Sequence, residues 1–136
     1  MSVEQRQQPT ERIELVAPVE GDFHAVVRLI IGGIAERVDF AFEEIDDLQL
    51  AVERLLAEAG SQRTVKMSFE VGPGSIRTRV GPLSERAIAD ALRDGVVRPG
   101  ELTLKRILQT VVDSFGVDEA GDAGIVVRLE KLKASP

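Results

Sequence analysis

The spacing of the apolar residues changes near Thr64 from a helical period to a strict alternation, so helices and strands share one short chain. Before this point apolar residues recur every three or four positions, as in amphipathic helices. From Val65 to Val71 every second residue is apolar, and after a turn at 72–74 the alternation continues to Val80. This pattern predicts a β-hairpin within a fold that also contains helices.

Six further segments have one of these two periods, in chain order a strand, four helices and a strand: Arg12–Ala17, Val19–Val38, Phe42–Ala59, Ser84–Arg93, Leu102–Phe115 and Ile125–Lys133. With the hairpin, this order predicts an α+β fold, a two-layer sandwich whose mainly antiparallel sheet carries helices on one face. Residues 1–11 are polar, and we expect a flexible N-terminal segment there and a single domain at 12–136.

The composition excludes several classes of site. The 136 residues include no cysteine and one histidine, which excludes disulfides, thiol nucleophiles and structural zinc. A net charge of -6 disfavours nucleic-acid binding, because phosphates are neutralised by an excess of lysine and arginine. No apolar run approaches the about 20 residues of a membrane span, and the polar start differs from a signal peptide. We therefore expect a cytoplasmic protein that contacts neither nucleic acid nor membrane.

The segment from Ile13 to Val52 contains three motifs in a fixed order. A strand ends in Ala17-Pro18, a helix carries Val-Val-Arg-Leu at 26–29, and a second helix starts with Glu-Ile-Asp-Asp-Leu at 44–48. In this order the motifs resemble the bacterial anti-sigma-factor serine kinases, which are small GHKL (Bergerat-fold, histidine-kinase-like) ATPases. The resemblance implies a nucleotide site, phosphorylation of an anti-anti-sigma (STAS-type) protein on serine, and sequestering of a sigma factor by a homodimer.

The same resemblance implies that the nucleotide site is degenerate. The family has a glutamate that acts on the nucleophile and an asparagine that coordinates magnesium, whereas this chain has Arg54 and Glu58 there and contains no asparagine. Bulky residues replace the family's Gly-x-Gly at Glu101–Lys105, around Thr103, and would obstruct the approach of backbone amides to phosphates. We expect Leu102 and Leu104 to fill that position, and we expect no bound cofactor.

The resemblance also suggests a partner surface on the first predicted helix. Arg28 matches an arginine with which the family contacts partner proteins, although it is also compatible with a solvated helix arginine. The predicted buried stripe of this helix includes Val26, Val27 and Ile30. Leu29 and Ile31 lie outside that stripe, and Gly32 is small enough to permit close approach of another helix. We predict these three as further contact residues.

Other polar features have simpler interpretations. Arg54 and Glu58 are four residues apart, which favours an ordinary ion pair within a helix. His24 is predicted as a boundary residue, and the acids at 43–47 as charges that favour a helix N-terminus. The segment 77–106 is rich in arginine, and this basic charge is compatible either with steering of an acidic partner or with scattered surface charge.

Three functions remain open at this point. The first is a pseudokinase that regulates transcription by binding a sigma factor or an anti-anti-sigma protein. The second is a serine kinase that uses ATP with magnesium at an atypical site, with Glu58 as a metal ligand. The third is a homodimeric scaffold domain.

Overall fold

The computed structural model describes residues 11–93 and 99–134. The described part contains five strands and four α-helices: β1 (Glu11–Pro18), α1 (His24–Glu36), α2 (Phe42–Ala57), β2 (Thr64–Gly72), β3 (Ser75–Leu83), α3 (Ala87–Arg93), α4 (Leu104–Val111), β4 (Ser114–Glu119) and β5 (Ile125–Leu132). The expected flexible segment 1–11 lies outside the described residues except for Glu11, which begins β1.

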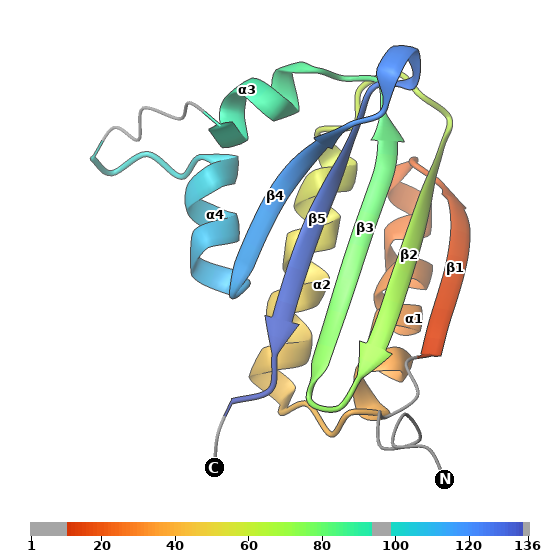
Figure 1. Ribbon diagram of the computed structural model, residues 1–136, viewed down its shortest axis with the longest axis vertical. Helices are drawn as coiled ribbons and strands as arrows, with labels where there is room; N and C mark the ends of the chain where they lie inside the picture. The colour runs from red at the N-terminus through yellow and green to blue at the C-terminus, as the bar shows by residue number, and fades with distance from the viewer. Residues whose placement is uncertain (1–10, 94–98, 135–136) are drawn as a thin grey trace, which may run out of the picture.

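The five strands form one antiparallel sheet in the order β1-β2-β3-β5-β4, so β1 and β4 are its edges (Figure 1). The predicted hairpin is β2–β3, in which Met67 lies opposite Val80. β5 then pairs with β3, and Val80 lies opposite Val127. Inward-facing residues of three neighbouring strands thus share one row, which gives the helices a continuous apolar surface.

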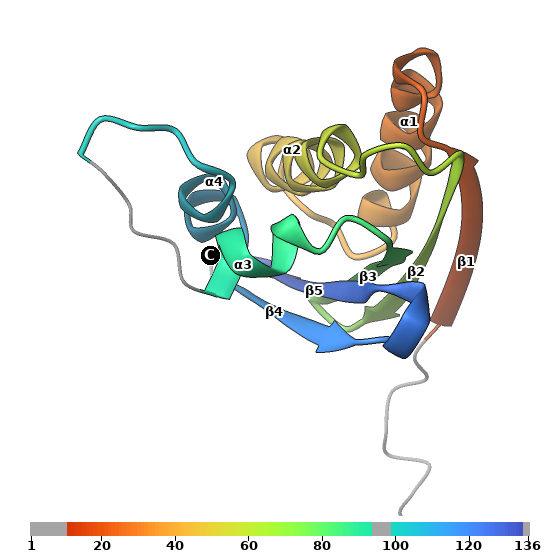
Figure 2. The ribbon, with the colours of Figure 1, turned by 90° about the horizontal axis from the view of Figure 1, so that it is seen from above.

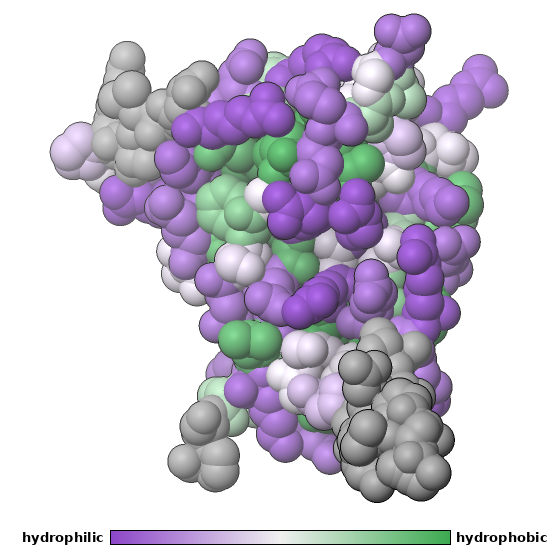
Figure 3. Space-filling view, in the orientation of Figure 1, coloured by the Kyte–Doolittle hydropathy of each residue, from purple (hydrophilic) through white to green (hydrophobic). Residues whose placement is uncertain are grey.

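All four helices lie on one face of the sheet, with α1 over the β1 side and α4 over the β4 side (Figure 2). The opposite face, toward the viewer in Figure 3, is mainly hydrophilic. This arrangement confirms the expected two-layer α+β sandwich. None of the helices in the described ranges is long and apolar enough to cross a membrane.

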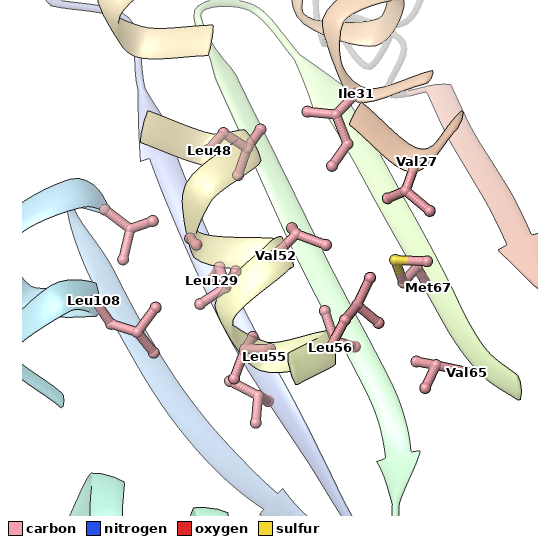
Figure 4. Packing of buried hydrophobic residues seen from close by; sticks show 14 of the residues in the cluster. Val27, Ile31, Leu48, Val52, Leu55, Leu56, Val65, Met67, Leu108 and Leu129 are labelled. Carbon is pink, nitrogen blue, oxygen red and sulfur yellow. The ribbon is translucent and has the colours of Figure 1, made fainter. Parts of the chain in front are cut away.

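The core lies between the sheet and α2, which is buried along one side. Leu48, Val52, Leu55 and Leu56 of this helix pack against inward-facing residues of β2 and β5 (Figure 4). The predicted stripe of α2 therefore faces the sheet. Most other residues of α2 are polar, although Phe42 and Leu50 are exposed. On either side of its buried face, α2 has a flank that carries residues of functional interest.

The fifth strand, β4, was not predicted. We expected a helix over Leu102–Phe115, but α4 spans only Leu104–Val111, and Phe115 lies in β4. Phe115 and Val117 are opposite inward-facing residues of β5, and together they extend the core. β4 has only six residues, which alternate around a central glycine, so its sequence alone favours a strand only weakly. Pairing with β5 stabilises the strand.

One glycine is required by the turn that joins β4 to β5. Gly124 has a φ of 120°, and a Cβ at this position would lie 1.9 Å from the carbonyl oxygen of Leu83. Only glycine avoids that overlap, so the close approach of this turn to the end of β3 depends on the missing side chain.

Candidate functional site

Arg28 links α1 to one flank of α2. Its Nη2 lies 2.6 Å from Oδ1 of Asp46, and its Nη1 pairs with Glu53. Gln49 Nε2 donates a hydrogen bond of 2.8 Å to the carbonyl oxygen of Arg28. A partner carboxylate that binds Arg28 therefore has to compete with two carboxylates of α2. These partners were not predicted, although Asp46 and Glu53 are seven residues apart and so lie on one helix face.

The other three predicted contact residues have different environments. Leu29 is 77% exposed, which leaves it open to a partner. Ile31 is 1% exposed and belongs to the core, so its prediction as a surface contact is wrong. Gly32 faces α2, where a Cβ would lie 3.4 Å from Gln49 Nε2. At that distance a Cβ would make an ordinary van der Waals contact, so a role of Gly32 in partner binding stays a prediction.

The error at Ile31 arises from two apolar rows that lie side by side on α1. The predicted stripe includes Val26, Val27, Ile30 and Ile34, and the structure buries Val27 and Ile34 of these together with Ile31. The two rows overlap at Val27 and Ile34, so the orientation of α1 on the sheet decides whether Ile30 or Ile31 is buried. As a result Val26 stays exposed and Ile30 is only half-buried.

An apolar surface remains where α1 lies beside the edge strand β1. Its exposed members, which we call the α1–β1 face, are Phe23, Val26 and Leu29; Val16 of β1 is exposed too, but it lies opposite Lys66 and alternates with the inward-facing Leu15 and Ala17. A shallow hollow of about 90 Å³ between the two elements is lined almost entirely by apolar side chains, including those of Leu15 and Ile30. Contiguous exposed apolar residues of this kind are typical of interaction surfaces.

The other flank of α2 forms a groove with α4. This α2–α4 groove has a volume of about 410 Å³, and its lining residues are Leu50, Arg54, Leu102, Ile107, Thr110 and Val111. Leu50 and Leu102 are exposed at its rim, whereas Ile107 and Val111 form its floor. It is this groove that contains the position where the resemblance implied a nucleotide.

Arg54 and Glu58 form the predicted ion pair within α2, with Nη2 and Oε2 3.9 Å apart. At that distance the pair makes no hydrogen bond. Nε of Arg54 is buried and has no hydrogen-bond partner among the residues that the structure describes. Arg54 therefore lines the groove with a partly exposed guanidinium whose only ion-pair partner within the described residues is distant.

The segment Glu101–Lys105 starts α4 and does not form a glycine-type loop. The hydroxyl of Thr103 accepts a hydrogen bond of 3.1 Å from the backbone N–H of Arg106, which caps the helix. Leu104 is buried in the core, whereas Leu102 is 73% exposed. The expectation that both leucines fill one pocket therefore holds only for Leu104, because Leu102 lines an open groove. Glu101 is exposed.

The acidic start of α2 has a structural role. Glu44 accepts a hydrogen bond of 2.6 Å from the backbone N–H of Ala41, and a second one from the backbone N–H of Ala134. Burial raises the pKa of Glu44, but these hydrogen bonds and the charges of Lys131 and Lys133 outweigh burial and lower the pKa below its ordinary value. Within 11–93 and 99–134, no cluster of three histidine or acidic side chains is suitable for a metal ion.

Several arginines of the segment 77–106 are neutralised by acids of β4 and β5. Arg77 pairs with Glu130, and Arg86 lies 2.9 Å from Glu119, which also pairs with Arg93. The hydrogen bond from Arg86 and the two positive charges lower the pKa of Glu119. These pairs favour the interpretation as local surface charge; Arg98, also in this segment, lies outside the described residues.

His24 also has a structural role. Its Nε2 lies 3.2 Å from the carbonyl oxygen of Val19, within hydrogen-bond distance. The contact fastens the start of α1 to the chain that follows β1. The side chain is half-buried, as expected for a boundary residue.

Comparison with known proteins gives one consistent group of relatives. The chain is 25% identical over 138 residues to the serine-protein kinase RsbW of Halalkalibacterium halodurans, covering 90% of this chain and 83% of that protein. It is 27% identical over 86 residues to RsbW of Bacillus cereus, where the match spans 63% of this chain and about half (51%) of the relative. A shorter match to RsbW of Bacillus thuringiensis is 36% identical over 42 residues, or 31% of this chain and 26% of the relative.

A solved structure has the same fold. It contains the RsbU and RsbW domains of Rv1364c from Mycobacterium tuberculosis, and it matches 94% of this chain and 34% of its own with a TM-score of 0.62 at 14% identity. No protein-family model matches the chain. The resemblance found between Ile13 and Val52 is thus confirmed over most of the chain, which is a homologue of the RsbW serine-protein kinases.

Proposed function

We propose that this protein is a regulatory binding domain that sequesters a sigma factor or binds an anti-anti-sigma (STAS-type) protein through its α1–β1 face, without using ATP. The observation that carries the proposal is the contrast between the two flanks of α2. One flank packs against α1, whose other side carries the exposed apolar α1–β1 face, and the other flank is an apolar groove where a nucleotide site would need donors for phosphates.

The α1–β1 face has the properties of a partner surface. Phe23, Val26 and Leu29 follow one another at three-residue spacing, so they are neighbours on the surface of α1. Arg28 lies on the side of α1 that faces α2, where Asp46 and Glu53 hold its guanidinium. A group of exposed aromatic and aliphatic side chains is typical of the centre of a protein interface.

The α2–α4 groove supports the absence of ATP chemistry. A phosphate cradle needs backbone N–H groups that a ligand can approach, usually through glycine. In this groove Leu102 and Ile107 occupy the surface, and the hydroxyl of Thr103 already caps α4. The position expected for a magnesium ligand holds Glu58, which faces Arg54 rather than a second acid.

Calorimetric titration tests partner binding directly. Sigma factors and STAS-domain proteins from the same genome are purified singly and titrated against the wild-type protein and Leu29→Asp. We expect one of them to bind the wild type, and we expect Leu29→Asp to weaken that binding at least tenfold, because a charge would be buried in an apolar interface. Leu102→Asp is the matched control, since Leu102 is about as exposed but lies in the α2–α4 groove.

Leu29 is a better probe than Arg28. Replacing Arg28 by alanine also leaves Asp46 and Glu53 without their partner, so that any effect on binding mixes with a change between α1 and α2. Equal loss of binding in Leu29→Asp and Leu102→Asp, or no loss in Leu29→Asp, contradicts the proposed face.

The same titration with ATP and magnesium separates the proposal from a kinase with an atypical site. The kinase alternative is favoured by the name of the relatives and by Glu58, whose exposed carboxylate is a possible magnesium ligand. We expect no heat of binding and no thermal stabilisation at millimolar ATP. Binding at micromolar ATP overturns the pseudokinase interpretation and makes a phosphorylated serine the next object of search.

A homodimer is part of the proposal. β1 is an edge of the sheet, and an edge strand presents unpaired backbone N–H and C=O groups that a second copy can use. Val16, exposed on this strand, is a suitable site for disruption. We expect Val16→Lys to shift the protein from dimer to monomer in sedimentation velocity, whereas the same change at Leu132, exposed near the C-terminus, has no effect.

A further inference from the structure

We propose that the α2–α4 groove is a binding site for a small amphiphilic carboxylate, a molecule with one apolar body and one anionic head. This inference goes beyond partner binding on the α1–β1 face and does not depend on it. The groove lies on the other flank of α2, beside α4 (Figure 2).

The apolar lining of the groove indicates that the main part of the ligand is apolar. This lining is formed by Leu50 and Leu102 at the rim and by Ile107 and Val111 on the floor, with Thr110 as the only uncharged polar side chain in the groove. Leu102 at the rim is 73% exposed, and covering it with an apolar ligand removes that side chain from water. A nucleotide, which needs hydrogen bonds for its base and phosphates, is a poor match for such a lining.

Arg54 indicates that the ligand carries an anionic group. It is the one charged residue in the lining, and its buried Nε has no hydrogen-bond partner among the described residues. Its ion-pair partner, Glu58, lies 3.9 Å from Nη2, too far for a hydrogen bond. The Arg54 side chain is 40% exposed, and a carboxylate in the groove would accept hydrogen bonds from the accessible nitrogens of the guanidinium, in the bidentate geometry that arginine favours.

The size of the groove favours a small molecule over a segment of a partner protein. Its volume of about 410 Å³ lies in the range typical of small-molecule sites. α4 contains eight residues and is about 12 Å long, and its exposed residues Arg106 and Gln109 are polar. The apolar wall is therefore too short to accept the several successive anchors of a docked helix.

Decanoate and decanol are the probes, because they share an apolar body and differ in the carboxylate. Each is titrated below its micelle concentration against the full chain, by displacement of the fluorescent anion 1-anilinonaphthalene-8-sulfonate and by calorimetry. We expect the wild type to bind decanoate more tightly than decanol. We expect Arg54→Met to weaken decanoate about tenfold and to leave decanol unchanged, because only the charged head loses its partner.

Two matched controls locate the site. Leu102→Asp should weaken both probes at least tenfold, whereas Leu29→Asp, a change of the same kind at a residue exposed on α1, should change neither. Arg106→Met, on α4 but outside the lining, should leave the preference for decanoate intact. Circular dichroism confirms that each variant is folded.

Three results overturn the proposal. They are no binding of decanoate by the wild type, an unchanged preference for decanoate in Arg54→Met, and equal losses in Leu102→Asp and Leu29→Asp. The α1–β1 face is tested separately, because its readout is the binding of protein partners and not of decanoate.

Discussion

Replacing Ile31 by alanine should destabilise the fold rather than affect a binding surface. Ile31 is 1% exposed, and the change removes three carbon atoms from the core between α1 and the sheet. At about 0.8 kcal/mol per buried methylene, the transfer term alone is about 2.4 kcal/mol. A cavity left behind adds to this, so we expect a loss of about 2.5–4 kcal/mol in the free energy of unfolding.

Urea unfolding followed by circular dichroism measures this loss. Leu29→Ala is the matched control, because Leu29 lies two residues away on the same helix and is 77% exposed. We expect its unfolding free energy to stay within about 0.5 kcal/mol of the wild type. Similar effects of the two substitutions, or a loss below about 1 kcal/mol for Ile31→Ala, would refute the assignment of the buried row of α1.

Four further substitutions test separate features of the fold. Gly124→Ala should cost about 2–5 kcal/mol in urea unfolding, from backbone strain and overlap with the oxygen of Leu83; Gly33→Ala, where a Cβ meets nothing, should instead stabilise α1 by up to about 1 kcal/mol. Thr103→Ala should cost about 1 kcal/mol through loss of the α4 cap, and a cost near zero by the same assay would contradict that role. Because the pKa of Glu44 is lowered on folding, its ionised form stabilises the fold above pH 4.5, and this stabilisation is lost as the pH falls through the lowered pKa. Melting temperatures of wild type and Glu44→Gln should therefore differ at pH 7 and converge in acid; a constant difference would rule the explanation out.

The pattern of apolar residues was sufficient for most of the secondary structure. The hairpin β2–β3 and the buried side of α2 follow from two clear periods, because each offers only one apolar face. The kinship to RsbW proteins was likewise visible between Ile13 and Val52, where motifs stand in a fixed order.

Tertiary contacts decided what these periods leave open. Phe115 and Val117 form a strand because β5 offers them a free edge, a partner that is distant in the sequence from the helix pattern before it. Ile31 is buried and Val26 is exposed because the sheet and α2 select one of two adjacent apolar rows on α1. Local sequence encodes which residues share a face, whereas the neighbours of that face determine whether it becomes core, as at Ile31, or surface, as at Val26.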